Sequence, residues 1–284
     1  MAIAFAGERG SFSELAAVEF FGGKQKPVPV QEFHNVFTAV ASEEIKYGIV
    51  PIENSMAGSI HQNYDLLLEN DLHIWGEVYL RVSHCLIANK GVSKKDIKTV
   101  YSHPQALAQC KKYLASMKKT EPFPVSNTAR GVRKIKEEKL NDAAAIASMQ
   151  AAIDYNMQIL SKRIEDYKFN TTRFLILSKN YRKKIPAKDN TKTSIVFTTK
   201  DIPGALFKSL SVFALRDINL LKIESRPLQG KNFEYLFYLD FEGKSDSEAQ
   251  RNAINHLQEI TSFLRILGSY PTGELKHPEY RKRI

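Results

Sequence analysis

One recurring pattern in the first 178 residues constrains the fold of this chain more than any other feature of its sequence. Short apolar segments are each followed by a turn of small or polar residues, and then by residues that favour a helix start. The pattern recurs at residues 3–14, 47–68, 98–114, 123–139 and 143–155. Strand, turn and helix units of this kind are characteristic of α/β domains with parallel strands. We therefore expect an α/β domain over residues 1–178.

The first of these turns ends in a strong helix start. Ser11 and Glu14 have the spacing of a capping box, in which the serine caps the helix and the glutamate reaches back, so a helix is expected from about Phe12. The free N–H groups of a helix start bind anions. The alternative is a well-capped helix that binds no ligand.

Polar residues also follow the predicted strand at 47–52, which is where open α/β sheets bind their ligands. Glu53, Asn54 and Ser55 stand at the carboxyl end of this strand, and residues 59–62 have the spacing of a second capping box. A ligand-binding turn and an ordinary turn of small polar residues explain this segment equally well.

The segment that begins at Ser102 supplies further hydrogen-bonding side chains after a predicted strand. Pro104 suits the first position of a helix, which is expected to continue to about residue 114. Gln105 and Gln109 are four residues apart and share one face of that helix. His103 is a candidate general base, but an imidazole beside a helix start is more often a cap or a core residue, and we favour such a structural role.

Residues 170–174 combine amide, hydroxyl and guanidinium groups just before an apolar strand. Arg173 can bind a carboxylate through two parallel hydrogen bonds, and the adjacent hydroxyl of Thr172 can donate to an oxygen that gains charge. These groups together suit an anion site with a proton donor. The alternative is an ordinary strand entrance with a solvated arginine.

The pattern changes after a lysine-rich segment at 179–192, which we interpret as an exposed linker. The next region predicts strands and helices in the order βαββαβ, the split βαβ layout of ferredoxin-like modules. Its predicted parts are a strand at 193–199, a helix from 201–204 to about 216, a strand at 219–228, a turn at Gly230-Lys231, a strand at 233–241, a helix at 245–261 and a strand at 263–270. This indicates a second, smaller α+β domain.

The net charge of +10 suits an anionic substrate, a nucleic acid or plain solubility. No nucleic-acid motif accompanies the charge, so no nucleic-acid partner is expected. No apolar run approaches the roughly 20 residues that a bilayer requires, and the opening residues lead into a strand without a basic leader, so we expect a cytoplasmic protein without a membrane partner. Cys85 and Cys110 are far apart and no metal-ligand spacing is present, so free thiols, no metal and no cofactor are expected.

Short motifs from both predicted domains resemble, in the same order, those of one enzyme family. They are the segments 10–14 (G-S-F-S-E, with Ser11 where threonine is usual), 50–55 (V-P-I-E-N-S), 102–105 with 109–110, 172–174 (T-R-F), 204–207 (G-A-L-F, with Phe207 where valine is usual) and 224–227 (E-S-R-P). The family is prephenate dehydratase, and the resemblance covers nearly the whole chain. It implies a catalytic domain over residues 1–178 and an ACT regulatory domain over residues 193–271.

The resemblance implies an α/β catalytic domain of two lobes, similar to periplasmic binding proteins, with the site in the cleft between them. The chain is expected to cross between lobes near Trp75 and again near Ser161. The ACT domain is expected to be a ferredoxin-like βαββαβ module that forms a homodimer or homotetramer. Phenylalanine is then the expected allosteric effector, bound between chains at Gly204, Ala205, Leu206, Glu224, Ser225, Arg226 and Pro227.

The implied activity is conversion of prephenate to phenylpyruvate in phenylalanine biosynthesis, with loss of carbon dioxide and water. The resemblance marks Thr172 as catalytic, and Glu53 is the alternative acid if burial raises its pKa. The expected substrate-binding residues are Arg173, Phe174, Asn54, Ser55, Ser102, Gln109 and Ser11. Arogenate dehydratase, which acts on the substrate bearing an amino group, and a non-catalytic amino-acid sensor are the alternatives.

Overall fold

The computed structural model describes residues 2–23, 25–182, 190–228 and 234–278, which form two compact units. Unit 1 contains Met1–Asp71, Val78–Ile176 and Glu274–Ile284, and unit 2 contains Leu72–Glu77 and Leu177–Gly273. None of the helices in the described residues has the length and hydropathy that a membrane-spanning helix needs.

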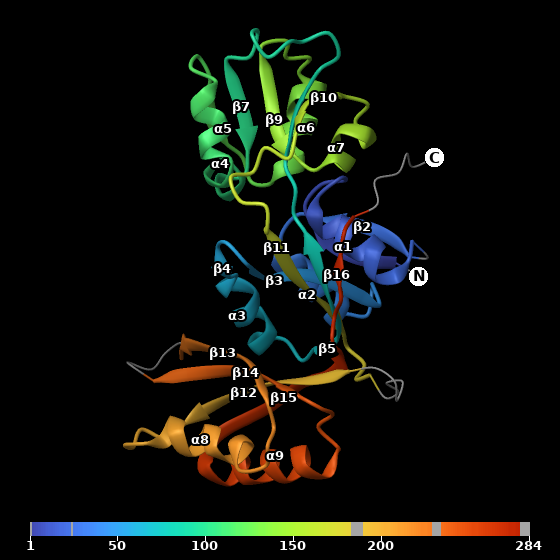
Figure 1. Ribbon diagram of the computed structural model, residues 1–284. Helices are drawn as coiled ribbons and strands as arrows, with labels where there is room; N and C mark the ends of the chain where they lie inside the picture. Colours follow the sequence, from blue (N-terminus) through green and yellow to red (C-terminus); the bar gives the residue numbers. More distant parts are fainter. Residues whose placement is uncertain (1, 24, 183–189, 229–233, 279–284) are drawn as a thin grey trace. The chain divides into compact units, whose positions relative to one another are not determined.

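The first lobe of unit 1 is built on a 7-stranded sheet (Figure 1). The strand order is β16 (Leu275–Lys276), β5 (His73–Arg81), β11 (Thr171–Ser178), β3 (Tyr47–Asn54), β1 (Ala2–Ala6) and β2 (Lys26–Val30), with β4 (Gly58–Ser59) paired to β3. The associated helices are α1 (Phe12–Phe21), α2 (Phe33–Ala41) and α3 (His61–Glu69). Because β1 runs parallel to both β2 and β3, the carboxyl ends of these strands meet at one edge of the sheet.

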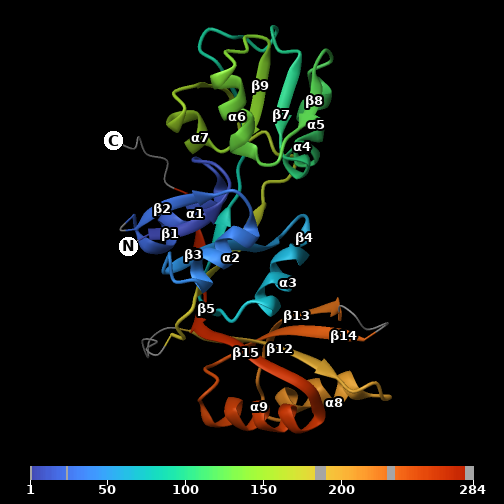
Figure 2. The same cartoon turned by 180° about the vertical axis from the view of Figure 1, so that it is seen from behind.

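The second lobe of unit 1 is built on a sheet with the order β10 (Gln158–Lys162), β6 (Cys85–Ala88), β9 (Ala143–Ala147), β7 (Thr99–Ser102) and β8 (Glu121–Pro124). Strand β7 is parallel to β8 and β9, and β6 is antiparallel to its neighbours. Figures 1 and 2 show α6 (Thr128–Glu137) and α7 (Met149–Asp154) on one face, and α4 (Pro104–Gln109) and α5 (Lys111–Ser116) on the other.

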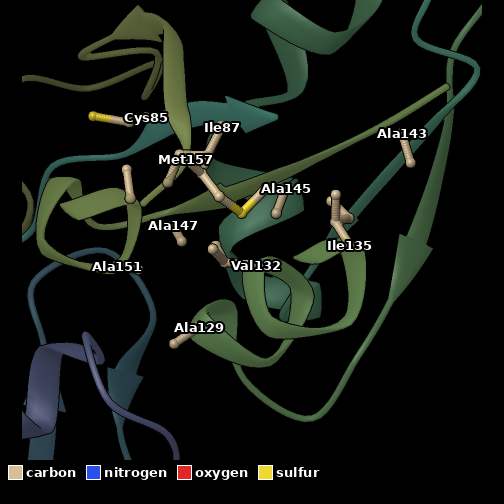
Figure 3. Close-up of a cluster of buried hydrophobic side chains, with 11 residues drawn as sticks. Cys85, Ile87, Ala129, Val132, Ile135, Ala143, Ala145, Ala147, Ala151 and Met157 are labelled. Atoms are coloured by element: carbon tan, nitrogen blue, oxygen red, sulfur yellow. The ribbon is translucent and has the colours of Figure 1, made fainter. Parts of the chain in front are cut away.

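Small side chains bring α6 close to this second sheet. Figure 3 shows Val132 and Ile135 of α6 gathered with Ala145 and Met157 in one buried cluster. A Cβ atom added to Gly131 would lie 2.9 Å from the carbonyl oxygen of Tyr101, so only glycine permits this approach. The close packing fixes the start of α6 beside the carboxyl ends of the strands.

The chain crosses between the lobes twice. The first crossing is at residues 82–84, between β5 and β6, and the second is at residues 163–170, between β10 and β11. The prediction of a crossing near Trp75 is therefore wrong, because Trp75 lies within β5. The second crossing begins directly after the strand that contains Ser161. The prediction of a two-lobed α/β fold is confirmed.

Unit 2 confirms the predicted βαββαβ order. Its sheet is β13 (Leu220–Pro227), β14 (Tyr235–Glu242), β12 (Thr191–Thr199) and β15 (Thr261–Pro271), with antiparallel pairing throughout. Helices α8 (Ala205–Ala214) and α9 (Glu248–Ile260) pack on one face of it over a shared apolar core. The predicted turn at Gly230-Lys231 lies outside the described residues, as does much of the predicted linker.

Several local predictions need correction. The helix expected over 104–114 is interrupted at Cys110, which separates α4 from α5. The second capping box is absent, since α3 begins after Ile60 without a side-chain cap. Strand β2 and helix α2 were not predicted. In β2, Pro27 and Pro29 obscure the strand pattern, and they are tolerated because β2 is at the edge of the sheet.

Candidate active site

A cavity of about 490 Å³ in unit 1 is lined by residues from both lobes. Its wall is formed largely where strands end and helices begin. The segments concerned are Ser11, Phe12 and Ser13 at α1, Glu32 and Phe33 at α2, His103, Gln105 and Ala106 at α4, and Ser126, Asn127 and Thr128 at α6. The parallel strands of both sheets thus direct their carboxyl ends towards one cavity, as in other open α/β folds.

The helix starts make this cavity suitable for an anion. The hydroxyl of Ser11 accepts a hydrogen bond from the backbone N–H of Glu14, and the side chain of Asn127 accepts one from Arg130. Both caps leave other N–H groups of the first turn available, at the positive end of the helix dipole. No lysine or arginine within the described ranges lines the cavity, so a bound carboxylate would depend on these N–H groups.

Asn54, at the end of β3, is the centre of a hydrogen-bond network in the cavity wall. Its Nδ2 donates to the hydroxyl of Thr172 over 2.9 Å and to Oδ1 of Asn170 over 2.8 Å. Its Oδ1 accepts from the backbone N–H groups of Met56 and Ala57, each at 3.0 Å. Donors and acceptors on both sides therefore fix which way the amide points.

The network continues into the second lobe through Gln105 and Gln109, which share one face of α4 as predicted. Their Nε2 atoms donate to Oδ1 of Asn54 over 3.3 and 3.4 Å. Oε1 of Gln109 accepts from Nδ2 of Asn170 over 2.9 Å and contacts Nε2 of His84 over 3.0 Å. The side chains of the two lobes thus form one connected polar wall.

His84 is a cavity residue that the sequence analysis missed. Its side chain is buried at 2% exposure, and Phe12 packs edge-on against its ring. Burial lowers the pKa of His84, against smaller opposing effects of Gln109 and Glu165. The available signal was a polar residue at the head of the apolar strand at 85–88, but a histidine in that setting is usually a core residue.

Of the two structural roles expected for His103, a helix cap or a core residue, the structure shows the cap. Its Nδ1 accepts a hydrogen bond from the backbone N–H of Gln105 over 3.2 Å, and burial lowers the pKa of the imidazole. The side chain also lines the cavity. Its acceptor nitrogen is already used by the helix, which argues against a role as general base.

The structure brings some of the predicted site residues to the cavity and leaves others outside its lining. Thr172 and Phe174 line it from alternate positions of β11, which directs Arg173, at 6% exposure, to the other side of the strand. The residues that line the cavity are Ser11, Asn54, Gln109, Thr172 and Phe174, and those outside the lining are Glu53, Ser55, Ser102 and Arg173.

Two of the outlying hydroxyls have structural partners. Ser102 is fully buried and donates to the carbonyl oxygen of Ile146 over 2.6 Å. Ser55 donates to the carbonyl oxygen of Phe169 over 3.1 Å. Glu53 precedes Asn54 on β3, so the alternation of the strand turns its side chain away when Asn54 faces the cavity, and Ser55 lies just beyond the end of the strand.

Unit 2 contains a separate cavity of about 290 Å³ at the start of α8. Gly204, Ala205 and Leu206 line it together with Glu234 and Tyr235. The other predicted effector residues, on β13, are not in its lining within this chain: Glu224 lies 3.6 Å from the ammonium of Lys222, and Ser225, Arg226 and Pro227 complete the strand. The described residues contain no group of His, Cys, Asp or Glu side chains that could hold a metal ion.

Comparisons with known proteins agree on one family. The sequence model of prephenate dehydratase matches residues 3–182. Arogenate dehydratase/prephenate dehydratase 2 of Arabidopsis thaliana is 48% identical over 95% of this chain and 72% of that protein. Prephenate dehydratase of Arthrobacter aurescens, solved in complex with L-Phe, is 29% identical with a TM-score of 0.88, over 95% of this chain and 90% of that one.

Another solved structure with the same fold carries a different description. It is named GqqA, a novel type of quorum quenching acylase, and is 31% identical with a TM-score of 0.87, over 96% of this chain and 98% of that one. The description belongs to that protein, and the likeness extends over both units of the present chain.

The prediction of a cytoplasmic location is wrong. Several relatives from Arabidopsis thaliana that are 43 to 48% identical to this chain are named as chloroplastic proteins. The prediction rested on the lack of a long apolar run and on the absence of a basic leader in the first residues, and neither observation determines the compartment of the protein.

Proposed function

This chain belongs to the prephenate dehydratase family of enzymes, and on that premise we propose that it converts prephenate to phenylpyruvate by decarboxylating dehydration. The observation that carries the proposal is the hydroxyl of Thr172. It lies in the cavity wall and accepts a hydrogen bond from Nδ2 of Asn54, while none of the described residues accepts its own proton. A hydroxyl held in this way is free to donate to a bound substrate.

The proposed reaction needs positioning and one proton. The bond from the ring to its carboxylate breaks, and its electron pair enters the ring as the bond to the ring hydroxyl breaks. The substrate dianion and one proton give the phenylpyruvate monoanion, carbon dioxide and water. Aromatisation of the ring drives the step, so the protein has to hold the dianion and assist the departing oxygen.

Helix starts support the binding of the dianion. The first turns of α1 and α6 face the cavity with capped N-termini, at Ser11 and Asn127. Each turn presents backbone N–H groups at the positive end of a helix dipole. We assign the two substrate carboxylates to these turns and the aromatic ring of Phe174 to the apolar part of the wall.

Thr172 is our choice for delivery of the proton, and Glu53 is the rejected alternative. Thr172 lines the cavity and Glu53 does not. A threonine hydroxyl is a weak acid, so the proton passes as the C–O bond breaks, or through Thr172 from solvent, rather than in a separate step. The hydrogen bond to the departing oxygen then strengthens as the oxygen gains charge.

Dehydration of arogenate to phenylalanine is a second candidate, supported by the names of relatives such as arogenate dehydratase 2 of Petunia hybrida, 45% identical. Both substrates carry the ring hydroxyl and the ring carboxylate, and they differ where prephenate has a ketone and arogenate an amino group. The deciding experiment compares kcat/KM of the purified protein for the two substrates. A higher value for arogenate would replace our assignment, and turnover of neither would reject it.

An acylase activity is less well supported than dehydration, despite the name of one similar structure. Acyl hydrolysis through a side-chain nucleophile requires a base that accepts the proton of that nucleophile. At Thr172 the neighbouring group is the Nδ2 of Asn54, which is a donor. Hydrolysis of an N-acyl amide by the wild-type protein that survives loss of the Thr172 hydroxyl would place an acylase site elsewhere.

We further propose that phenylalanine binds unit 2 and inhibits the enzyme. The cavity at the start of α8 and the L-Phe complex of the Arthrobacter aurescens protein support this. Gly204 has φ +76° and open space where a Cβ would lie, so a ligand can approach the backbone closely. The carboxylate is assigned to the first turn of α8, and the ammonium to Glu224 of a neighbouring chain.

The test is activity against phenylalanine concentration for the wild type and for Gly204→Val. The added side chain occupies the space of the ligand and keeps its carboxylate from the backbone N–H groups of α8. A lost hydrogen bond with a charged ligand costs about 1.5–3 kcal/mol, so half-inhibition should require at least about ten times more phenylalanine. Equilibrium binding of phenylalanine to both proteins is the control. An unchanged inhibition curve would place the effector in the other unit.

We also propose a homodimer or homotetramer formed through unit 2. Strand β13 is at the edge of its sheet and exposes Leu221 and Ile223, at 41% and 45%. An exposed apolar edge strand is a surface for pairing with another chain. Light scattering should give at least twice the monomer mass, and Ile223→Lys should lower it; a monomeric wild type at micromolar concentration would refute the proposal.

A further inference from the structure

The imidazole of His84 has one nitrogen, Nδ1, that makes no hydrogen bond with any described residue. Its Nδ1 is fully buried and has no hydrogen-bond partner, although the side chain lines the candidate active-site cavity. The other ring nitrogen, Nε2, is 3.0 Å from Oε1 of Gln109. Buried polar atoms are normally satisfied, so an unpartnered one in a cavity wall indicates a ligand position.

The network around Gln109 determines which ring nitrogen carries the proton. Nε2 of Gln109 donates to Oδ1 of Asn54, and Oε1 of Gln109 accepts from Nδ2 of Asn170. The amide oxygen is therefore the group that faces His84, and an amide oxygen only accepts. Nε2 of His84 must be the donor, which leaves Nδ1 as a bare acceptor in the neutral ring.

The surroundings keep this ring neutral. Burial lowers the pKa of His84, and this effect exceeds the opposing effects of Gln109 and Glu165. Glu165 is the carboxylate that raises the pKa of His84, and it accepts hydrogen bonds from the backbone N–H of His84 and from the hydroxyl of Ser83. Phe12, on α1, packs against the ring in a T-shaped arrangement and carries no charge. A ligand at Nδ1 must therefore supply a hydrogen-bond donor.

We propose that, once the side chains that cover it shift, Nδ1 of His84 accepts a hydrogen bond from the ring hydroxyl of the substrate, so that His84 contacts the leaving group directly. The inference rests on the proposed function. The two carboxylates and the ketone of prephenate are acceptors, and its ring hydroxyl is its one donor. The hydrogen-bonded path from Thr172 through Asn54 and Gln109 to His84 holds both residues in the same wall.

Thr172 and His84 both contact the ring hydroxyl of the substrate, but in different ways. Thr172 donates to a lone pair of the hydroxyl oxygen, while the hydroxyl proton stays on oxygen and points to Nδ1. The C–O bond breaks and the oxygen leaves as water, with one proton newly received and one held by His84. No proton passes to the imidazole. As the oxygen gains a proton, its O–H becomes a stronger donor, so the contact with His84 strengthens in the transition state.

Two substitutions separate the roles of the two nitrogens. His84→Gln places an amide nitrogen near the position of Nε2, which keeps the donor to Gln109 and removes the acceptor at Nδ1. His84→Asn places an amide oxygen near the position of Nδ1, which keeps the acceptor and removes the contact with Gln109. The readouts are kcat/KM for prephenate and for arogenate, and the inhibition constant of phenylpyruvate, which lacks the ring hydroxyl.

We expect His84→Gln to lower kcat/KM by about tenfold or more for whichever substrate the wild type uses, with the phenylpyruvate inhibition constant unchanged within about twofold. His84→Asn should retain more activity than His84→Gln. The inference is overturned if His84→Gln is as active as the wild type, if both variants lose activity and phenylpyruvate binding together, or if the loss is confined to arogenate, which would put the amino group at Nδ1.

The activity of the wild-type protein shows whether a negative result concerns His84 alone or the proposed function as a whole. A wild type that turns over neither substrate rejects the dehydratase assignment, and with it the contact of His84 with a substrate hydroxyl. A wild type that is active, with an unaffected His84→Gln variant, rejects only the role of His84.

Discussion

Asn54 donates a hydrogen bond of 2.9 Å to the hydroxyl of Thr172, a residue 118 positions further along the chain. The donor comes from the end of β3 and the acceptor from β11, which are neighbouring strands of one sheet. Because Asn54 supplies the proton in this bond, Thr172 retains its own. The pair converts a solitary hydroxyl into an oriented donor in the cavity wall.

Replacement of Thr172 by valine should lower kcat by about 10²- to 10³-fold, because it removes a donor to the departing oxygen while keeping the shape of the side chain. Thr172→Ser retains a hydroxyl and should retain most of the activity. Steady-state kinetics and a thermal unfolding curve for both variants give the comparison. Near-normal turnover by Thr172→Val would end the assignment of Thr172 as the proton donor.

Asn54→Asp should lower kcat by a similar factor, because the new oxygen cannot donate to Thr172 and instead accepts the proton that Thr172 would give to the substrate. It also faces Oδ1 of Asn170, so we expect a loss of about 1–3 kcal/mol in the free energy of unfolding. Asn63→Asp is the matched control: Asn63 is also buried and donates to the carbonyl of Pro51, but its own side chain is not part of the cavity lining. Equal kinetic effects of both substitutions would contradict the special role of Asn54.

Gly10→Ala should destabilise the chain. The residue has φ +79°, and an added Cβ would lie 2.5 Å from Cα of Ala151 on α7. Backbone strain and the clash together should cost about 2–5 kcal/mol in the free energy of unfolding, measured in urea. Gly91→Ala is the control, since Gly91 has φ +88° and open space around it. A similar loss in the two variants would show that the contact with α7 is adaptable.

Arg173→Lys should affect stability more than substrate binding. Arg173 lies between two cavity-lining residues of β11, so the alternation of the strand turns its guanidinium away from the cavity. We expect a lower Tm with KM within about threefold of wild type, because lysine cannot reproduce the planar fork of a buried arginine. A tenfold rise in KM without loss of Tm would restore the sequence-based expectation of a carboxylate-binding arginine.

Stability should fall below neutral pH in a way that depends on His84. Burial lowers the pKa of His84 in the folded chain from 6.5, so the unfolded chain binds more protons between the two pKa values. The stabilisation is complete above about pH 6.5 and is lost as the pH falls through the folded pKa. His103 contributes in the same direction. Measured by urea unfolding from pH 7.5 to 5, the free energy of unfolding should decline less for His84→Gln than for the wild type. An identical decline would show that protonation of His84 does not destabilise the folded chain.

Local sequence patterns were sufficient for most elements of this fold and for their order, but not for β2 and α2. The cap at Ser11 marks a helix start through the first few residues after it, and this cap is present in the structure. The βαββαβ order of unit 2 follows from alternating and helical periodicities in the same way. The strand β2 was missed because its prolines are tolerated only at a sheet edge, and being at the edge is a property of the assembled sheet.

The sequence by itself determined most of the elements, and it identified Asn54, Gln109 and Thr172 as chemically useful groups. Only the tertiary structure decided which face of each strand meets the cavity. Adjacent residues of a strand point to opposite faces, and the sequence does not show whether Thr172 or Arg173 faces the cavity. In the structure, Thr172 lines the cavity and Arg173 does not. The unpartnered nitrogen of His84 could not be recognised from the sequence either. Its role depends on the amides of Gln109 and Asn170, 25 and 86 positions away, which are oriented by hydrogen bonds that form only in the folded chain.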